Sequence, residues 1–279
     1  MPPWHPYFPP VEWQADLDRI RATDVLAFLR TWYQPSNATL AIAGAFDPAK
    51  AVDLVNRYFG GLPSVAPPRR QALPSWSNEH VWLRVAAVQP HDLIEVAWHT
   101  PAYCTEDDAA LDLVSTVLAG PGNTRLGPQL VATRLAMRVS AREASSRASS
   151  LFAIDIEPAP SVDLQAVMNT TRDTIAELAR SVTDVEVRRA KAVRADSTLL
   201  SLETVQARAM RLAHSRASGC PEGPDDHWGL DRYANIGPAE VSRAAATWLA
   251  KERRVVTVVF ADSRYPPRGM VLERTVIPR

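Results

Sequence analysis

Apolar and polar residues follow patterns along the chain that predict a mixture of helices and strands. Residues 23–33 carry apolar side chains at the i, i+3, i+4 and i+7 spacing of a helix that packs along one side, with Thr23 as its expected N-cap. Residues 40–46 are short and apolar, as strands are, and Asp47-Pro48 turns the chain into a second helix over 49–59. This part of the chain therefore predicts a helix, a strand and another helix.

A second series of elements follows residues 61–77, whose prolines and lack of periodicity are typical of a linker. Thr105 is expected to begin the first helix of this series, where Glu106, Asp107 and Asp108 suit the helix dipole. Strands are predicted at 81–88, 93–99, 139–145, 151–157 and 255–261. Helices are predicted at 105–118, 127–137, 162–181, 184–212 and 238–249, and residues 266–279 are expected to be irregular.

The segment that begins at Ile20 recurs near the other end of the chain. Placing Ile236 under Ile20, an offset of 216 residues (236 minus 20), aligns the two segments without a gap. Thr31-Trp32 then falls on Thr247-Trp248, Val25 on Val241, Asp24 on Glu240, and the apolar strand 40–45 on 256–261. The matched length and the shared Thr-Trp favour a duplicated unit. The second copy would span about 79–262, and the first would lack most of its N-terminal part.

The charge balance limits the kinds of partner that the chain can bind. Lys plus Arg and Asp plus Glu both number 31 among 279 residues, which argues against nucleic-acid or anionic-membrane binding. The densest basic run, Arg188 to Arg194, is expected to be a solvated helix face. No apolar run reaches about 18 residues, so no transmembrane segment is predicted.

The N-terminal sequence MPPWHPYFPP lacks the apolar core of about 7–15 residues that a signal peptide needs, so none is predicted in this chain. Its prolines are typical of a linker inside a longer polypeptide, and a periplasmic and a cytoplasmic parent protein both remain open. Cys104 and Cys220 show no metal-ligand spacing, and two isolated thiols are expected, with one disulfide as the alternative.

Several motifs follow one another in a characteristic order. The segment WYQPSNATLAIAGAFDP at 32–48 is followed by NRYFGGLP at 56–63. The glycine-rich turn GPGNTRL at 120–126 precedes LVATRLA at 130–136 and VSA at 139–141, and SVTD at 181–184, AKA at 190–192 and SLE at 201–203 complete the series. Together they resemble the insulinase/pitrilysin zinc peptidases, a family that includes the mitochondrial processing peptidases, and the resemblance extends from residue 5 to about residue 262.

The resemblance implies an α+β fold of two-layer lobes, each a mixed antiparallel sheet with helices packed on one face. It implies that two lobes or two subunits enclose an extended peptide, which can add a strand to a sheet edge. It also implies zinc hydrolysis in the parent enzyme. There an H-x-x-E-H helix supplies two histidine ligands and a glutamate base, and a downstream glutamate supplies the third ligand.

This chain lacks the zinc motif of the family. Its six histidines occur in no H-x-x-E-H and no H-E-x-x-H sequence. His91, Glu95 and His99 would share one face of a strand by parity, and an exposed or hydrogen-bonded set is expected there rather than a zinc site. No cofactor is therefore expected in this chain, and the zinc is expected in the parent enzyme or a partner subunit.

Many members of the family place an arginine and a tyrosine, seven residues apart, on the second lobe, where the pair is thought to hold the substrate. Alignment on VSA at 139–141 puts the tyrosine position at Met137 and the arginine position at Leu130, or at Val131 if a one-residue gap is allowed. None of these side chains supplies a phenolic or guanidinium donor. The lobe is therefore expected to lack the pair, and its substrate-binding residues remain unassigned.

These observations predict four segments: the remnant of a first lobe at 1–63, a linker at 64–78, a complete second, non-catalytic lobe at 79–265, and an irregular tail at 266–279. The predicted function is the substrate-enclosing C-terminal part of an insulinase-family zinc metalloendopeptidase, inactive alone. The alternative is a non-catalytic scaffold or assembly subunit of the same fold. The expected partners are a peptide substrate and a second peptidase lobe or subunit, in a homo- or heterodimer, and not nucleic acid.

Overall fold

A computed structural model describes residues 17–63, 65–66, 80–87, 91–218, 229–249, 254–261 and 271–277. The chain forms two compact units. Unit 1 consists of Met1–Trp76 and Ser201–Glu222, and unit 2 consists of Ser77–Leu200 and Gly223–Arg279. Most of the expected linker at 64–78 lies outside the described residues. No helix in the described part of the chain combines the length and the apolar composition needed to cross a membrane.

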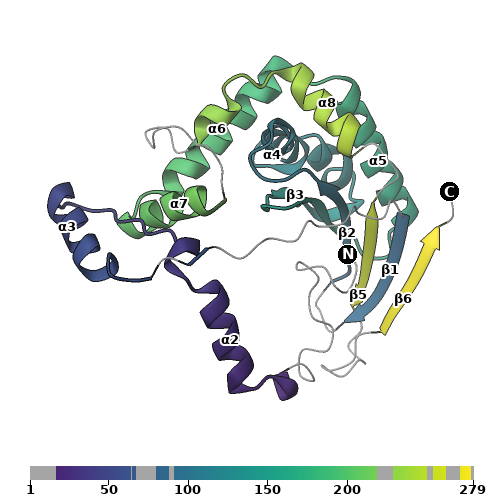
Figure 1. Ribbon diagram of the computed structural model, residues 1–279. Coiled ribbons are helices and arrows are strands. Elements are labelled where there is room, and N and C mark those ends of the chain that lie inside the picture. The colour runs from purple at the N-terminus through teal and green to yellow at the C-terminus, as the bar shows by residue number, and fades with distance from the viewer. Residues whose placement is uncertain are drawn as a thin grey trace. The chain divides into compact units, whose positions relative to one another are not determined.

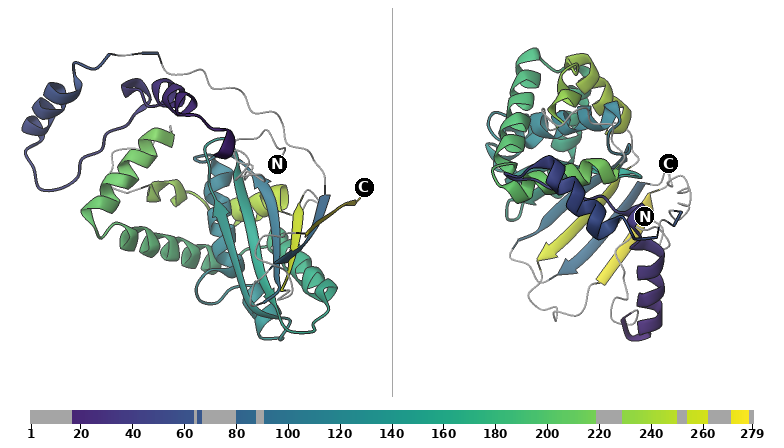
Figure 2. Two further views of the ribbon diagram at one scale, coloured as in Figure 1. Left: turned by 90° about the horizontal axis from the view of Figure 1, so that it is seen from below. Right: turned by 60° about the vertical axis from the view of Figure 1, so that its left-hand side comes forward.

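Unit 2 is built on a single mixed sheet of six strands, seen from several sides in Figure 1 and Figure 2. Their order across the sheet is β3-β4-β2-β5-β1-β6, so β3 and β6 form its edges. β1 and β5 run parallel, and every other neighbouring pair is antiparallel. The strands are β1 (His80–Ala87), β2 (Leu93–Thr100), β3 (Ala136–Ala144), β4 (Ser150–Pro158), β5 (Val255–Ala261) and β6 (Val271–Ile277).

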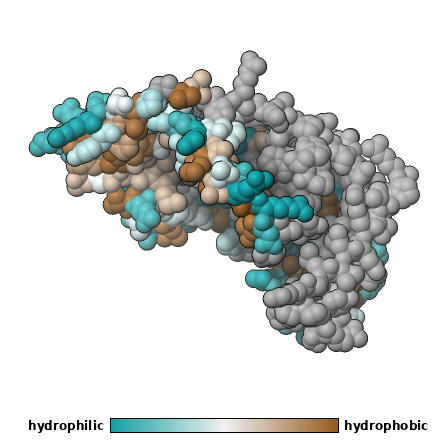
Figure 3. Space-filling view, turned by 60° about the horizontal axis from the view of Figure 1, so that its bottom comes forward, coloured by the Kyte–Doolittle hydropathy of each residue, from teal (hydrophilic) through white to brown (hydrophobic). Residues whose placement is uncertain are grey.

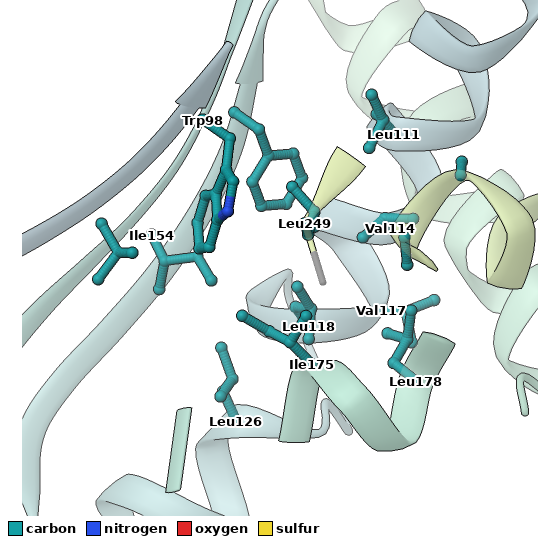
Figure 4. Close-up of a cluster of buried hydrophobic side chains, with 14 of the residues drawn as sticks. Trp98, Leu111, Val114, Val117, Leu118, Leu126, Ile154, Ile175, Leu178 and Leu249 are labelled. Atoms are coloured by element: carbon teal, nitrogen blue, oxygen red, sulfur yellow. The ribbon is translucent and has the colours of Figure 1, made fainter. Parts of the chain in front are cut away.

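The helices of unit 2 that pack on this sheet lie on one of its faces (Figure 1). Alternate residues of β2 and β4 point toward them, as in the cross-strand pair Trp98 and Phe152, whose rings meet edge to face with centroids 6.1 Å apart. Figure 4 shows Trp98 and Ile154 directed at leucines of the helices. The helices are α4 (Glu106–Ala119), α5 (Leu164–Arg180) and α8 (Pro238–Trp248). The predicted α+β class, with helices on one face of a mixed sheet, is confirmed.

Unit 1 contains α2 (Ala22–Trp32), the short 3-10 helix η1 (Pro35–Asn37), α3 (Pro48–Phe59) and α7 (Val205–Ser218). The Asp47 side chain caps α3 by accepting hydrogen bonds from the backbone N–H groups of Ala49 and Lys50. Neither α2 nor α3 contains a buried residue. Figure 3 shows hydrophobic residues exposed among hydrophilic ones on one face of the molecule. The helices α2 and α3 are therefore amphipathic helices whose apolar sides are exposed.

Four expected elements and one expected N-cap differ from the structure. Residues 40–46 form no strand, because a strand needs a hydrogen-bonded neighbour and the described residues of unit 1 contain none. The helix expected at 184–212 is divided into α6 (Asp184–Ser201) and α7, because the Thr204 hydroxyl accepts a hydrogen bond from the N–H of Ala207 and so begins a new helix. Thr23 lies inside α2, whose N-cap is Arg21.

The other two differences concern the edges of the sheet. The helix expected at 127–137 is only the π-helical turn η2 (Gly127–Val131), since the chain turns at Arg134, at φ 63°, and enters β3 at Ala136. The tail expected to be irregular at 266–279 contains β6, which forms because β1 offers it an unpaired edge along its whole length.

Candidate peptide-docking face

The face of the sheet opposite α4, α5 and α8 carries charged residues along β2, β3 and β4. The Arg138 Nε atom lies 2.9 Å from Glu157 Oε1, and Arg142 pairs with Asp155 and, at 3.0 Å, with Glu95. These side chains share a face because strand residues alternate between the two sides of the sheet. The Arg138 side chain is 74% exposed and that of Arg142 47%, so the pairs add little to stability, but they place two arginine side chains on this face of the sheet.

β3 is the edge strand beside this face. Among the described residues it pairs only with β4, so its other side has no strand partner. Its register with β4 shifts between Ala136 and Arg138, and Met137 lies at this bulge. An edge of this kind presents backbone N–H and C=O groups that an extended peptide can pair with.

The positions aligned with the family's arginine and tyrosine lie immediately before this edge and at its start. Leu130 is fully buried in the core, so its side chain is closed to a bound peptide. Val131 is 39% exposed and Met137 is 41% exposed. Of the two residues that can align with the arginine position, only Val131 is exposed. The correspondence of Val131 and Met137 with the family's pair remains a prediction.

The expected set of His91, Glu95 and His99 is not one face of a strand. β2 begins at Leu93, so His91 precedes it, and only Glu95 and His99 share a face. Glu95 is paired with Arg142. Within the described ranges, no three His, Cys, Asp or Glu side chains are grouped as metal ligands. The described residues therefore do not fit the zinc site that the family implies.

A buried charge network lies behind β3, and sequence reasoning did not find it. Asp108 of α4 is fully buried and pairs with Arg232 of the 3-10 helix η4 (Leu230–Tyr233). One turn along α4, Asp112 accepts hydrogen bonds from Arg194 of α6 and, at 2.6 Å, from the Tyr233 hydroxyl. Burial raises the pKa of Asp112, and Arg194 and Tyr233 act against that shift. The network joins α6 and η4 to α4.

One expectation fails in this network, and another is incomplete. Asp108 lies in the first turn of α4, where its charge suits the helix dipole as expected, and its carboxylate is in addition buried and paired with Arg232. Arg194 was expected on a solvated face, but its guanidinium reaches Asp112. The local sequence pattern shows neither ion pair, because each partner lies far away in the chain.

Glu143, near the end of β3, points toward the same network. Its Oε1 atom accepts a hydrogen bond from the Thr100 hydroxyl at 2.6 Å, while its Oε2 atom is buried. Burial raises the pKa of Glu143 to about 8. The Thr100 hydrogen bond and Arg194 oppose this shift, and Asp108 and Asp112 add to it. The carboxyl group is therefore neutral in the folded protein at neutral pH and charged above about pH 8.

We expect Glu143→Gln to remove a pH dependence of stability. Because the pKa of Glu143 is higher in the folded than in the unfolded chain, the folded state binds more protons between about pH 4.5 and 8. The free energy of unfolding should then fall as pH rises through this window, by at most about 1.4 kcal/mol per pH unit. Urea unfolding of both proteins at pH 5, 6.5 and 8 measures this. If the difference in free energy of unfolding between the variant and the native chain stays the same from pH 5 to pH 8, the expectation is contradicted.

Cys104, in the turn before α4, is disulfide-bonded. The expectation of two isolated thiols is therefore wrong for Cys104, and the alternative of a disulfide holds for it. Cys220 lies outside the described residues. His5 and His227 also lie outside them.

Comparisons with known proteins agree on one family. The model described as the peptidase M16 inactive domain matches residues 19–194. A protease from Helicobacter pylori has a TM-score of 0.70 at 16% identity, covering 90% of this chain and 62% of its own. The peptidase M16 inactive domain from Pseudomonas fluorescens has a TM-score of 0.72 at 16% identity, covering 89% and 59%.

A protein assigned as a zinc protease, from Bordetella pertussis Tohama I, has a TM-score of 0.53 at 24% identity, covering 63% of this chain and 98% of its own. No curated protein sequence matches the chain. The chain thus spans about three fifths of the length of the Helicobacter and Pseudomonas structures. The family model covers more than half of the chain and the solved structures share its fold, so the resemblance is confirmed and the chain belongs to the peptidase M16 inactive-domain family.

Proposed function

We propose that this chain is the substrate-enclosing, non-catalytic part of a zinc peptidase, and that unit 2 binds an extended peptide as an added strand on β3. The observation that carries the proposal is the edge position of β3, with a strand partner on one side only among the described residues. Backbone pairing along such an edge provides affinity, and alternate side chains of the peptide provide specificity. The neighbouring residues Arg138 and Arg142 would meet those side chains.

The catalytic zinc would belong to another part of the parent enzyme or to a partner subunit. This is supported by the Bordetella protein, which is assigned as a zinc protease, and by the lack of a fitting ligand set among the described residues. In this arrangement the chain contributes to peptide binding, and hydrolysis requires the zinc-bearing lobe. The purified chain should bind peptides without cleaving them.

N-methylated peptides test the mode of binding. The probe is the ten-residue peptide that binds best from a random library, made also in two forms with N-methyl groups at either the odd or the even positions. A strand added to one edge uses every second N–H, so only one methylated form should lose binding, by about tenfold or more. Fluorescence anisotropy measures the affinities. Equal losses in both forms, equal retention in both, or no library binder contradict strand addition.

Hydrogen exchange locates the bound peptide on the chain. Amides of β3 should exchange more slowly when the peptide is present, and amides of β6, the opposite edge of the same sheet, should not change. Slower exchange at β6 alone would place the peptide on the opposite edge and contradict docking on β3. A chain that binds no peptide but stays in a complex whose activity is unchanged without it would favour the scaffold alternative.

A further inference from the structure

The two arginines of β3 differ in how many carboxylates hold them. Arg138 pairs with one acid, its cross-strand neighbour Glu157 of β4, and its Nε and Nη2 atoms both contact the same Oε1 atom. Arg142 pairs with two acids, with Asp155 of β4 through Nη1 and with Glu95 of β2 through Nη2. The charges of these groups therefore cancel around Arg138, whereas one negative charge is left over around Arg142.

Positive charge lies at the edge of this face, and negative charge lies farther in. Both arginines belong to the edge strand, whereas their acidic partners belong to β4 and β2, the next two strands of the sheet. The arginine side chains are also more exposed than those of the acids, which are 23% to 34% exposed. A strand added to β3 would lie about 4.8 Å from β3 and about 10 Å from β4. Because salt screens charges over about 8 Å under physiological conditions, its side chains would interact mainly with the arginines.

The other side of β3 is apolar in the middle of the strand. Val139 and Ala141 alternate with the outward residues 138, 140 and 142, and they are partly buried against the hydrophobic core. Side chains that lie directly opposite each other on neighbouring strands are about 5 Å apart and interact. Residues of a bound strand would therefore lie in turn opposite the polar residues of β3 and opposite Val139 and Ala141.

We propose that β3 selects acidic peptides, with one Asp or Glu of the bound strand opposite Arg138 and apolar residues opposite Val139 and Ala141. Arg138 makes the selection because one carboxylate balances its charge and its side chain is largely exposed, so a second carboxylate can share its guanidinium. An acidic residue opposite Arg142 gives no gain in affinity, because two carboxylates already exceed the charge of that arginine. The inference rests on the proposed docking of a peptide on β3 and specifies the class of peptide.

A positional scan of the best library binder tests this preference. Each residue of the peptide is replaced in turn by Glu, Gln and Lys, and fluorescence anisotropy measures the affinities. At one position Glu should bind about three- to fivefold more tightly than Gln, and Lys more weakly than Gln, since opposite charges on paired strand residues attract and like charges repel. At about 1 M salt, where screening shortens the range of a charge to about 3 Å, the difference should fall below about twofold. Four residues along the peptide (142 minus 138), opposite Arg142, Glu should bind no better than Gln.

Substitutions of Arg138 test whether this side chain causes the preference. Arg138→Gln should abolish the preference for Glu, and Arg138→Glu should reverse it, so that the Lys peptide binds best. A purely structural effect would weaken the binding of the Glu, Gln and Lys peptides equally. Both variants should fold, because the ion pair that they break is exposed, and far-UV circular dichroism checks this.

Arg172→Gln is the matched control for Arg138→Gln. Arg172 is also an exposed arginine paired with one acid, Asp173, but it belongs to the helix α5 and not to β3. The variant should keep the preference of the native chain for Glu. A loss of the preference in Arg172→Gln contradicts a specific role of Arg138.

Failure of this inference can be distinguished from failure of the proposed function. If peptides bind but no position prefers Glu, or if the preference for Glu remains in Arg138→Gln or Arg138→Glu, the acidic preference is overturned while strand addition on β3 stands. If no library peptide binds, peptide docking on β3 and the acidic preference are both overturned.

Discussion

Val241→Asp is expected to unfold unit 2 or to lower its free energy of unfolding by about 4 kcal/mol or more. Val241 is a residue of α8 that is fully buried in the hydrophobic core, so the substitution places a carboxylate in an apolar environment. A typical domain is stable by only about 5–15 kcal/mol, so this loss is a large part of the total. Urea unfolding followed by tryptophan fluorescence and far-UV circular dichroism measures it.

The repeat provides a control at the equivalent position. Val25 occupies the place of Val241 in α2 but is 46% exposed, so Val25→Asp should change the stability of the isolated chain by less than about 0.5 kcal/mol. The two substitutions are chemically identical and lie at the same helix position. A similar large loss from both would contradict the exposed position of Val25 on α2.

Asp108→Ala is expected to lower the free energy of unfolding by about 3–5 kcal/mol, the second largest effect. The substitution leaves the Arg232 guanidinium with only the more distant carboxylate of Asp112, at 3.9 Å. It also removes the acceptor of the hydrogen bonds from Ser145 Oγ and from the N–H of Cys104. Urea unfolding of the variant and of the native chain measures the difference in free energy of unfolding. Tyrosine fluorescence is a second signal, because Tyr233 of η4 lies in the network.

Glu106→Ala, one position into the same helix, is the control for Asp108→Ala. Glu106 is 69% exposed and pairs with Arg243 at 3.0 Å on the surface, so its removal should cost no more than about 1 kcal/mol. If Asp108→Ala costs as little as Glu106→Ala, the network does not hold η4 on α4. The comparison separates a buried ion pair from an exposed one with the helix held constant.

The sequence predicts the elements whose signals are local. The caps Thr105 and Asp47, and the apolar spacing of α2 and α8, lie within one helix each, and the structure has these helices with nearly the predicted bounds. Strand formation depends on a neighbour that can be far away in the chain. The pattern of 40–46 was therefore interpreted as a strand that does not form, and β6 was missed although β1 pairs with it.

The candidate site follows the same rule. The family resemblance indicates Leu130, Val131 and Met137 as candidate positions, but only the structure shows which of these is buried. The charge network could not be predicted, because Asp108 and its partner Arg232 are 124 residues apart. A buried acid and a solvated acid look alike in the first turn of a helix.

The position of β1 in the sheet has a consequence for biosynthesis. β1 is the first strand of unit 2 to be made, and both of its neighbours, β5 and β6, begin at Val255 or later. Its two edges therefore stay unpaired while almost the whole of the rest of the chain is synthesised. Pairings over such long sequence separations also form slowly, since a large loop must close before they give any stability. The sheet of unit 2 can therefore be completed only after β5 and β6 have left the ribosome, and until then β1 presents two unpaired edges.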